Sequence, residues 1–307
     1  MSKKNKKVSK KFVKKQFNLV GLSLMLYVLI VLIAPLIVKI YFDTTLGQFV
    51  GNKTIKIGIL YAFILIGTFV PFSLLKFGTK TKLGDFWRKC SISFYDIFVY
   101  TVLFTAIGTI IMFITSILNS YIYLGSGTVS SIGVSMPGEF LNNPLYFVLF
   151  VIATPIVEEI AFRGVLLRVL GRYGNRFGMI SCSLIYALLH LTFADSITTF
   201  FLSIILIKIT LRYRSVQPAI IIHMLFNLII YGLELLPVNL YYVTAIVIFG
   251  IYLLLAVLLI TRQVKFIKIR SRTNDKYIYK LFFTRPAVII AIILMLGYSV
   301  ATMFYLL

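Results

Sequence analysis

Two histidines and one pair of adjacent glutamates are the residues of this sequence best suited to chemistry. His190 and His223 are the only histidines in the chain, and the glutamates are Glu158 and Glu159. All four lie in or beside long apolar stretches. Ionisable side chains inside a bilayer are costly, so those that occur there are candidates for a functional site. A carboxylate and an imidazole together can activate water, which favours a hydrolytic site.

The two glutamates cannot share one task. Neighbours on a helix point roughly 100° apart, so Glu158 and Glu159 face different surroundings. Arg163 follows Glu159 by four residues, the spacing that favours an ion pair on one helix face. We therefore expect Glu159 and Arg163 to be structural supports, because pairing offsets the cost of burying either charge. Glu158 is then left to face a cavity as a general base.

The histidines allow two catalytic schemes. In the first, His190 orients a water that Glu158 deprotonates, while His223 and Asn227, four residues apart on one helix face, donate hydrogen bonds to the oxyanion. In the second, Glu158, His190 and His223 hold a divalent metal such as zinc, which activates the bound water. The H-E-x-x-H spacing of soluble zinc proteases is absent, so the sequence requires no cofactor and leaves both schemes open.

The composition places these residues in a membrane protein. Sixty per cent of the residues are hydrophobic and 13% are charged, and apolar runs long enough to cross a bilayer recur along the chain. The net charge of +22 comes from short basic clusters between the apolar runs, as in cytoplasmic loops. This pattern indicates contact with membrane lipids and argues against nucleic acid as a partner.

The predicted fold is an all-α, polytopic transmembrane bundle of about nine helices with a cytoplasmic N-terminus. Eight lysines occupy the first fifteen residues, and the loops placed on the same side are basic, whereas the outer loop Asn119–Pro144 has no Lys or Arg. The expected spans are Phe17–Ile40, Ile57–Leu75, Phe94–Leu118, Leu145–Phe162, Phe177–Phe193, Ser196–Leu211, Pro218–Leu236, Leu240–Thr261 and Pro286–Leu306. The cytoplasmic loops are Lys76–Lys89, Arg163–Arg176, Arg212–Arg214 and Arg262–Arg285.

These spans divide the chain into four parts. The motif-bearing core is residues 145–236, which hold the fourth to seventh helices. The other parts are a basic tail at residues 1–16, three helices and the outer loop at 17–144, and two helices with a basic loop at 237–307.

Three ordered motifs in the core resemble those of the CAAX-protease and bacteriocin-processing (CPBP, or Abi) family. They are Glu158–Arg163 (EEIAFR), Tyr186–His190 (YALLH) and His223–Asn227 (HMLFN), against family patterns EExxxR, FxxxH and HxxxN/D. Tyr186 stands where the family usually has Phe. The resemblance implies a helical intramembrane endopeptidase with a cavity open to the cytoplasm and a membrane-associated peptide or protein as substrate. It also implies Glu158 as base, His190 as its partner, and His223 with Asn227 as oxyanion donors.

Two other functions use the same residues. One is a non-catalytic scaffold, regulator or bacteriocin-immunity protein of the same fold, and the other is a transporter or channel with a polar pathway. The presence of Glu158, His190, His223 and Asn227 together favours the peptidase, since a binding role does not need all four, and the lack of an internal repeat argues against a transporter. The Lys-, Ile- and Tyr-rich composition is typical of a protein of a bacterial plasma membrane.

Overall fold

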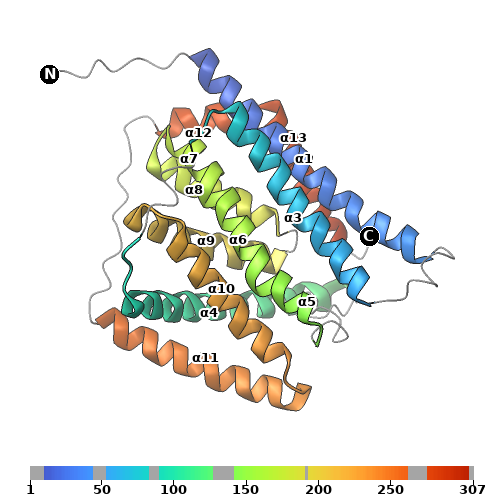
Figure 1. Cartoon of the computed structure of the whole chain (residues 1–307), viewed down its shortest axis with the longest axis vertical. Helices are drawn as coiled ribbons and strands as arrows, with labels where there is room; N and C mark the ends of the chain where they lie inside the picture. Colours follow the sequence, from blue (N-terminus) through green and yellow to red (C-terminus); the bar gives the residue numbers. More distant parts are fainter. Residues whose placement is uncertain are drawn as a thin grey trace.

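The protein is helical throughout the part of the chain that its computed structural model describes, which is residues 10–43, 53–82, 90–126, 142–190, 193–261 and 275–303. Figure 1 shows the helices packed into one bundle. The predicted all-α polytopic bundle is therefore confirmed. In chain order the elements are α1 (Lys10–Asp43), α3 (Lys53–Gly78), α4 (Phe94–Ser126), α5 (Pro144–Phe147), η1 (Val148–Ala153), α6 (Thr154–Glu159), η2 (Ile160–Leu166), α7 (Leu167–Gly171), α8 (Asn175–Leu188), α9 (Phe193–Tyr213), α10 (Gln217–Glu234), α11 (Val238–Thr261), α12 (Asp275–Phe283) and α13 (Pro286–Met303).

Each of the nine predicted spans coincides with a helix, but the helices differ in length. Among the described residues, six spans are long and apolar enough to cross a membrane, or seven if α12 and α13, bent by 73°, count as one. Helix α8 has 14 residues and is therefore about 21 Å long, short of the roughly 30 Å of a hydrocarbon core. The protein is an integral membrane protein, and the number nine stays a prediction.

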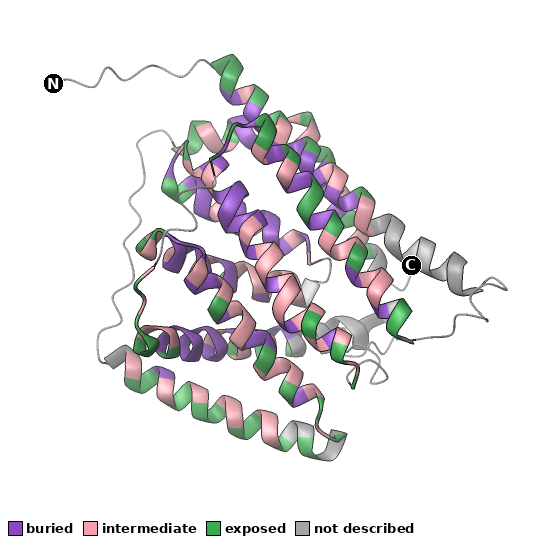
Figure 2. Ribbon diagram, viewed as in Figure 1, coloured by how far each residue is buried: buried purple, intermediate pink, exposed green. Residues whose placement is uncertain are grey.

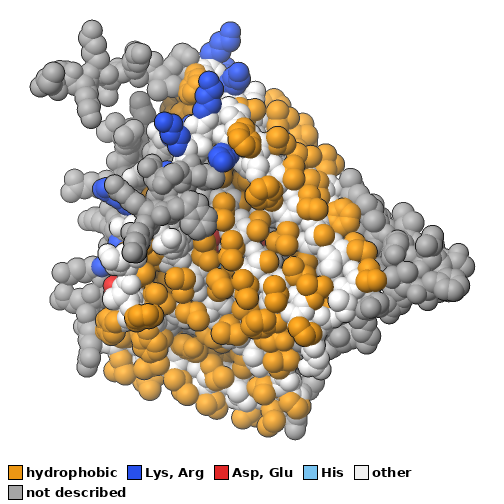
Figure 3. Space-filling view, in the orientation of Figure 1, with side chains coloured by type: hydrophobic (Ala, Val, Ile, Leu, Met, Phe, Trp, Pro, Cys, Tyr) orange, Lys and Arg blue, Asp and Glu red, His pale blue; other side chains and the backbone are white. Residues whose placement is uncertain are grey.

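The Lys and Arg side chains that Figure 3 colours blue gather at the top and left of the visible face. Arg172, in the turn after α7, donates to the Thr79 carbonyl at 3.1 Å and to Thr81 Oγ1 at 2.8 Å, just beyond α3. At the start of α1, the Lys10 ammonium lies 5.8 Å from the ring centre of Tyr277 in α12. Segments predicted to share the cytoplasmic side thus lie together, and orange apolar side chains cover most of the visible face beyond them (Figure 3).

The fourth span extends beyond its predicted end. The span was predicted to end at Phe162, with a loop from Arg163, whereas the helical run continues to Gly171 and Arg163 is fully buried. A charge usually ends a span, but the partner of Arg163 is on the same helix, so the charge is neutralised inside the bundle. The fifth span was predicted to reach Phe193, but α8 ends at Leu188.

The run from α5 to α7, together with α8, lies between two outer groups of helices (Figure 1). Helices α1, α3 and α13 pack on one side, and α4, α9, α10 and α11 pack on the other. Figure 2 shows α8 mostly buried, while α11 is mostly half-buried or exposed. Within the run, burial is concentrated from Ala161 to Leu170, and this stretch packs with the mostly buried α8. The run and α8 carry two of the three motifs.

A tight hairpin joins α7 to α8. Gly174 begins the second helix with φ 151° and ψ 134°, a conformation that favours glycine. A Cβ on Gly178 would lie 2.8 Å from the backbone N and Cα of Gly171, closer than real contacts allow. The missing side chain at Gly178 lets the two backbones approach, and this contact fixes the first motif against the second.

Candidate active site

Two π-helical segments flank the glutamate pair. Segment η1 precedes α6 and η2 follows it, so Glu158 and Glu159 end a short α-helix between two wider turns. Pro155 accounts for the first, because it lacks the N–H that would bond the carbonyl of Val151. Such π segments occur frequently at functional sites. In each of them one carbonyl accepts from another helix: Phe150 from Asn227 Nδ2 at 3.0 Å, and Phe162 from Cys182 Sγ at 3.5 Å.

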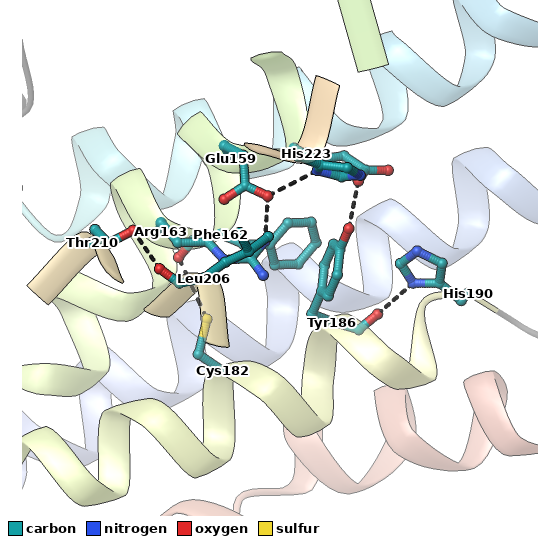
Figure 4. A network of polar contacts seen from close by, with 10 residues as sticks. Glu159, Phe162, Arg163, Cys182, Tyr186, His190, Leu206, Thr210 and His223 are labelled. Carbon is teal, nitrogen blue, oxygen red and sulfur yellow. Dashed lines mark hydrogen bonds and ion pairs between the residues drawn. The ribbon is translucent and has the colours of Figure 1, made fainter. Parts of the chain in front are cut away.

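Glu159 belongs to what we call the closed network, which consists of Glu159, Arg163 and His223. Its Oε1 accepts from Arg163 Nη1 at 2.8 Å and lies 3.0 Å from His223 Nδ1 (Figure 4). The side chains of Glu159 and Arg163 are fully buried, and that of His223 is 12% exposed. The predicted ion pair is confirmed, and the structure adds His223 to it.

Glu158 belongs to the open network, which consists of Glu158, Tyr186 and His190. The Tyr186 hydroxyl donates to Glu158 Oε2 at 2.7 Å, and His190 Nδ1 lies 2.8 Å from the Tyr186 carbonyl oxygen. Glu158 and His190 are half-buried. The two reactive candidates are thus joined through Tyr186, and no direct bond between them occurs among the described residues. The predicted separation of the two glutamates onto different surroundings is confirmed.

The hydrogen bonds of the two histidines determine which ring nitrogens carry a proton. A carbonyl oxygen only accepts, so His190 Nδ1 carries a proton, and the neutral ring then has a lone pair on Nε2. When His223 Nδ1 donates to the Glu159 carboxylate, its Nε2 carries a proton only in the imidazolium form. His190 is therefore suited to accept a hydrogen bond from water, and His223 can donate at Nε2 only when it is charged.

Asn227 lies one turn beyond His223 on α10 and is 8% exposed. One of its amide hydrogens is used by the Phe150 carbonyl, and an amide nitrogen has two. The second hydrogen can donate to another group. The bond to Phe150 fixes the side chain against η1, the segment that leads into the glutamates.

The described side chains do not form the ligand set that the metal scheme needs. Among the described residues, no group of three or more His, Cys, Asp or Glu side chains is arranged to hold a metal ion. The network bonds explain this, because Glu158 lies against Tyr186 while His223 lies against Glu159. The zinc scheme stays a prediction.

The comparison with known families covers the same part of the chain. Residues 140–229 match the family model described as Rce1-like, type II CAAX prenyl endopeptidase. This segment is similar to the CAAX protease family, in agreement with the resemblance of its three motifs. The match supports a CAAX-type intramembrane endopeptidase in general, with a membrane-associated substrate. No curated protein and no solved structure matches the chain.

Five of the six predicted site residues belong to the closed or the open network. The sixth, Asn227, lies one helical turn from His223. Sequence reasoning missed the bond between Tyr186 and Glu158. The replacement of the usual Phe of the motif by Tyr186 could have predicted this bond, because it adds a hydroxyl. An apolar environment leaves such a hydroxyl in need of a partner, and the nearby carboxylate provides it.

Proposed function

We propose that this protein is an intramembrane endopeptidase of a bacterial plasma membrane that hydrolyses a peptide bond in a membrane-associated peptide or protein. One observation carries the proposal: the half-buried Glu158 and His190 are both held by Tyr186, through its hydroxyl and its carbonyl. A carboxylate and an imidazole that are fixed yet accessible suit the activation of water. The basic end of the bundle and the tail at residues 1–16 face the cytoplasm in this proposal.

In the proposed reaction, Glu158 takes a proton from water and the hydroxide adds to the carbonyl carbon of the scissile peptide bond. His190 orients the water through the lone pair on Nε2. His223, as imidazolium, and the second amide hydrogen of Asn227 donate to the oxyanion that forms. When the carbon–nitrogen bond breaks, the proton held by Glu158 passes to the leaving amine. Glu159 and Arg163 hold His223 in place.

The test uses the full chain in lipid nanodiscs with a quenched fluorescent peptide that ends in a farnesylated CaaX sequence. We expect Glu158→Gln and His190→Gln each to lower kcat/KM by about 10²- to 10⁴-fold, the usual contribution of an acid–base group. Glu234→Gln changes another glutamate, at the end of α10, and is expected to leave cleavage unchanged. The same peptide without the farnesyl group tests whether the lipid is recognised.

Two outcomes would redirect the assignment. If folded Glu158→Gln and His190→Gln proteins cleave as wild type does, the peptidase proposal fails. If membrane and secreted peptides are identical in cells with wild-type protein and with Glu158→Ala, while both confer the same phenotype, the scaffold or immunity role replaces it. Metal analysis of the purified protein and the effect of a chelator on cleavage separate the metal-free scheme from the zinc scheme.

A further inference from the structure

The ring of Tyr186 packs against three neighbouring side chains. Its ring is 4% exposed, lies 4.5 Å from the guanidinium carbon of Arg163, and makes an edge contact with Phe162 at 4.6 Å. A second edge contact, also at 4.6 Å, joins it to the ring of His190. Packing of this kind leaves the ring one position, so its hydroxyl oxygen is a fixed point beside Glu158.

The hydroxyl is not needed for the packing. Phe and Tyr have rings of the same shape, and the motif to which Tyr186 belongs usually has Phe at this position. What the hydroxyl adds is one hydrogen bond of 2.7 Å to Glu158 Oε2, the typical length for an O–H donor and an oxygen acceptor. Among the described residues, no other group forms a hydrogen bond with the Glu158 side chain. Without it, the several rotamers of a glutamate become available to Glu158.

We propose that the Tyr186 hydroxyl is a positioning group that holds the carboxylate of Glu158 in its working orientation. This inference rests on the proposed function, in which Glu158 is the base. Fixing Oε2 on the phenol leaves Oε1 as the oxygen that takes the proton from water. Tyr186 then positions the two other members of the open network, Glu158 through its hydroxyl and His190 through its carbonyl.

The direction of the kinetic effect separates positioning from a change in basicity. A carboxylate that loses a hydrogen-bond donor becomes a stronger base, which would by itself raise kcat or leave it unchanged. Loss of position lowers kcat, since a misplacement of about 1 Å can cost on the order of 100-fold. KM is expected to stay constant, because the hydroxyl bonds Glu158 and not the substrate.

The experiment compares Tyr186→Phe with Tyr173→Phe in the full chain in nanodiscs, with the farnesylated peptide as probe. Tyr173 lies in the α7–α8 hairpin, and its buried hydroxyl has no hydrogen-bond partner in the described part of the chain. We expect Tyr186→Phe to lower kcat by about 10- to 100-fold at unchanged KM, and Tyr173→Phe to change neither constant. In the infrared spectrum, the carboxylate band that Glu158→Gln removes is expected to shift in Tyr186→Phe and to stay in place in Tyr173→Phe.

The outcomes for Tyr186 and for the proposed function can be told apart. If Glu158→Gln abolishes cleavage while Tyr186→Phe keeps the wild-type kcat, the function stands and the positioning role is overturned. An infrared band that does not shift in Tyr186→Phe also overturns it, without use of any substrate. If Glu158→Gln itself remains active, the proposed function fails and Tyr186 has no base to position.

Discussion

The closed and open networks begin at adjacent residues of the same type and have opposite properties. Glu159 is fully buried and faces a guanidinium and an imidazole, whereas Glu158 is half-buried and faces one phenol. The Arg163 guanidinium offsets the cost of burying the Glu159 carboxylate. Glu158 accepts one hydrogen bond, from a neutral donor, and part of its side chain stays accessible. Burial and partner charge, and not residue type, thus separate the supporting glutamate from the proposed base in this site.

Glu159→Ala should disrupt the closed network and cause the largest loss of stability. Removing Glu159 leaves Arg163 buried without its counterion, and such a loss costs about 3–5 kcal/mol. Thermal unfolding of the purified protein measures the effect. Glu158→Ala is the matched control, since it leaves one phenol unpaired and should cost about 1–3 kcal/mol at most. Equal losses for the two variants would contradict the division into closed and open networks.

Gly178→Ala should disturb both networks at once. The added Cβ meets the Gly171 backbone at 2.8 Å, so α7 and α8 must separate, and overpacking of this kind costs about 1–3 kcal/mol. Because Arg163 and Tyr186 lie on the two sides of this hairpin, we expect peptide cleavage to fall together with the melting temperature. Gly232→Ala in α10 is the control, because a Cβ there meets nothing within 4 Å. Wild-type stability and cleavage in Gly178→Ala would show that the close approach has no role.

Asn227→Ala should give the smallest loss of stability of the three variants, and it tests whether Asn227 acts in cleavage or only in packing. It removes one hydrogen bond, to the Phe150 carbonyl, worth about 0.5–1.5 kcal/mol. Cleavage should fall further than this loss of stability explains, because the same amide donates to the oxyanion in the proposed reaction. Thr210→Val, which removes a single bond to the Leu206 carbonyl in α9, is expected to cost a similar stability and keep full cleavage. If both variants lose cleavage alike, Asn227 is a structural residue only.

The class of the protein and the local relations within each helix could be predicted from the amino-acid sequence. Apolar length and loop charge gave the helical membrane bundle, since both depend on one segment and its solvent at a time. The four-residue spacing gave the ion pair of Glu159 and Arg163, because a helix brings such residues together without help from the rest of the fold. The three motifs indicated the family for the same reason, since each motif is local.

The contacts between side chains of different helices could not be predicted from the sequence and required the folded structure. Tyr186 reaches Glu158 over 28 residues of sequence, and His223 reaches Glu159 over 64. These contacts depend on the α7–α8 hairpin, on the π segments around the glutamates and on the packing of α10, none of which has a periodic signal. The predicted end of the fourth span at Phe162 was wrong for a related reason, because the burial of Arg163 depends on helices that surround it. Helix formation is a property of a segment, whereas the environment of a charged side chain is set by everything packed around it.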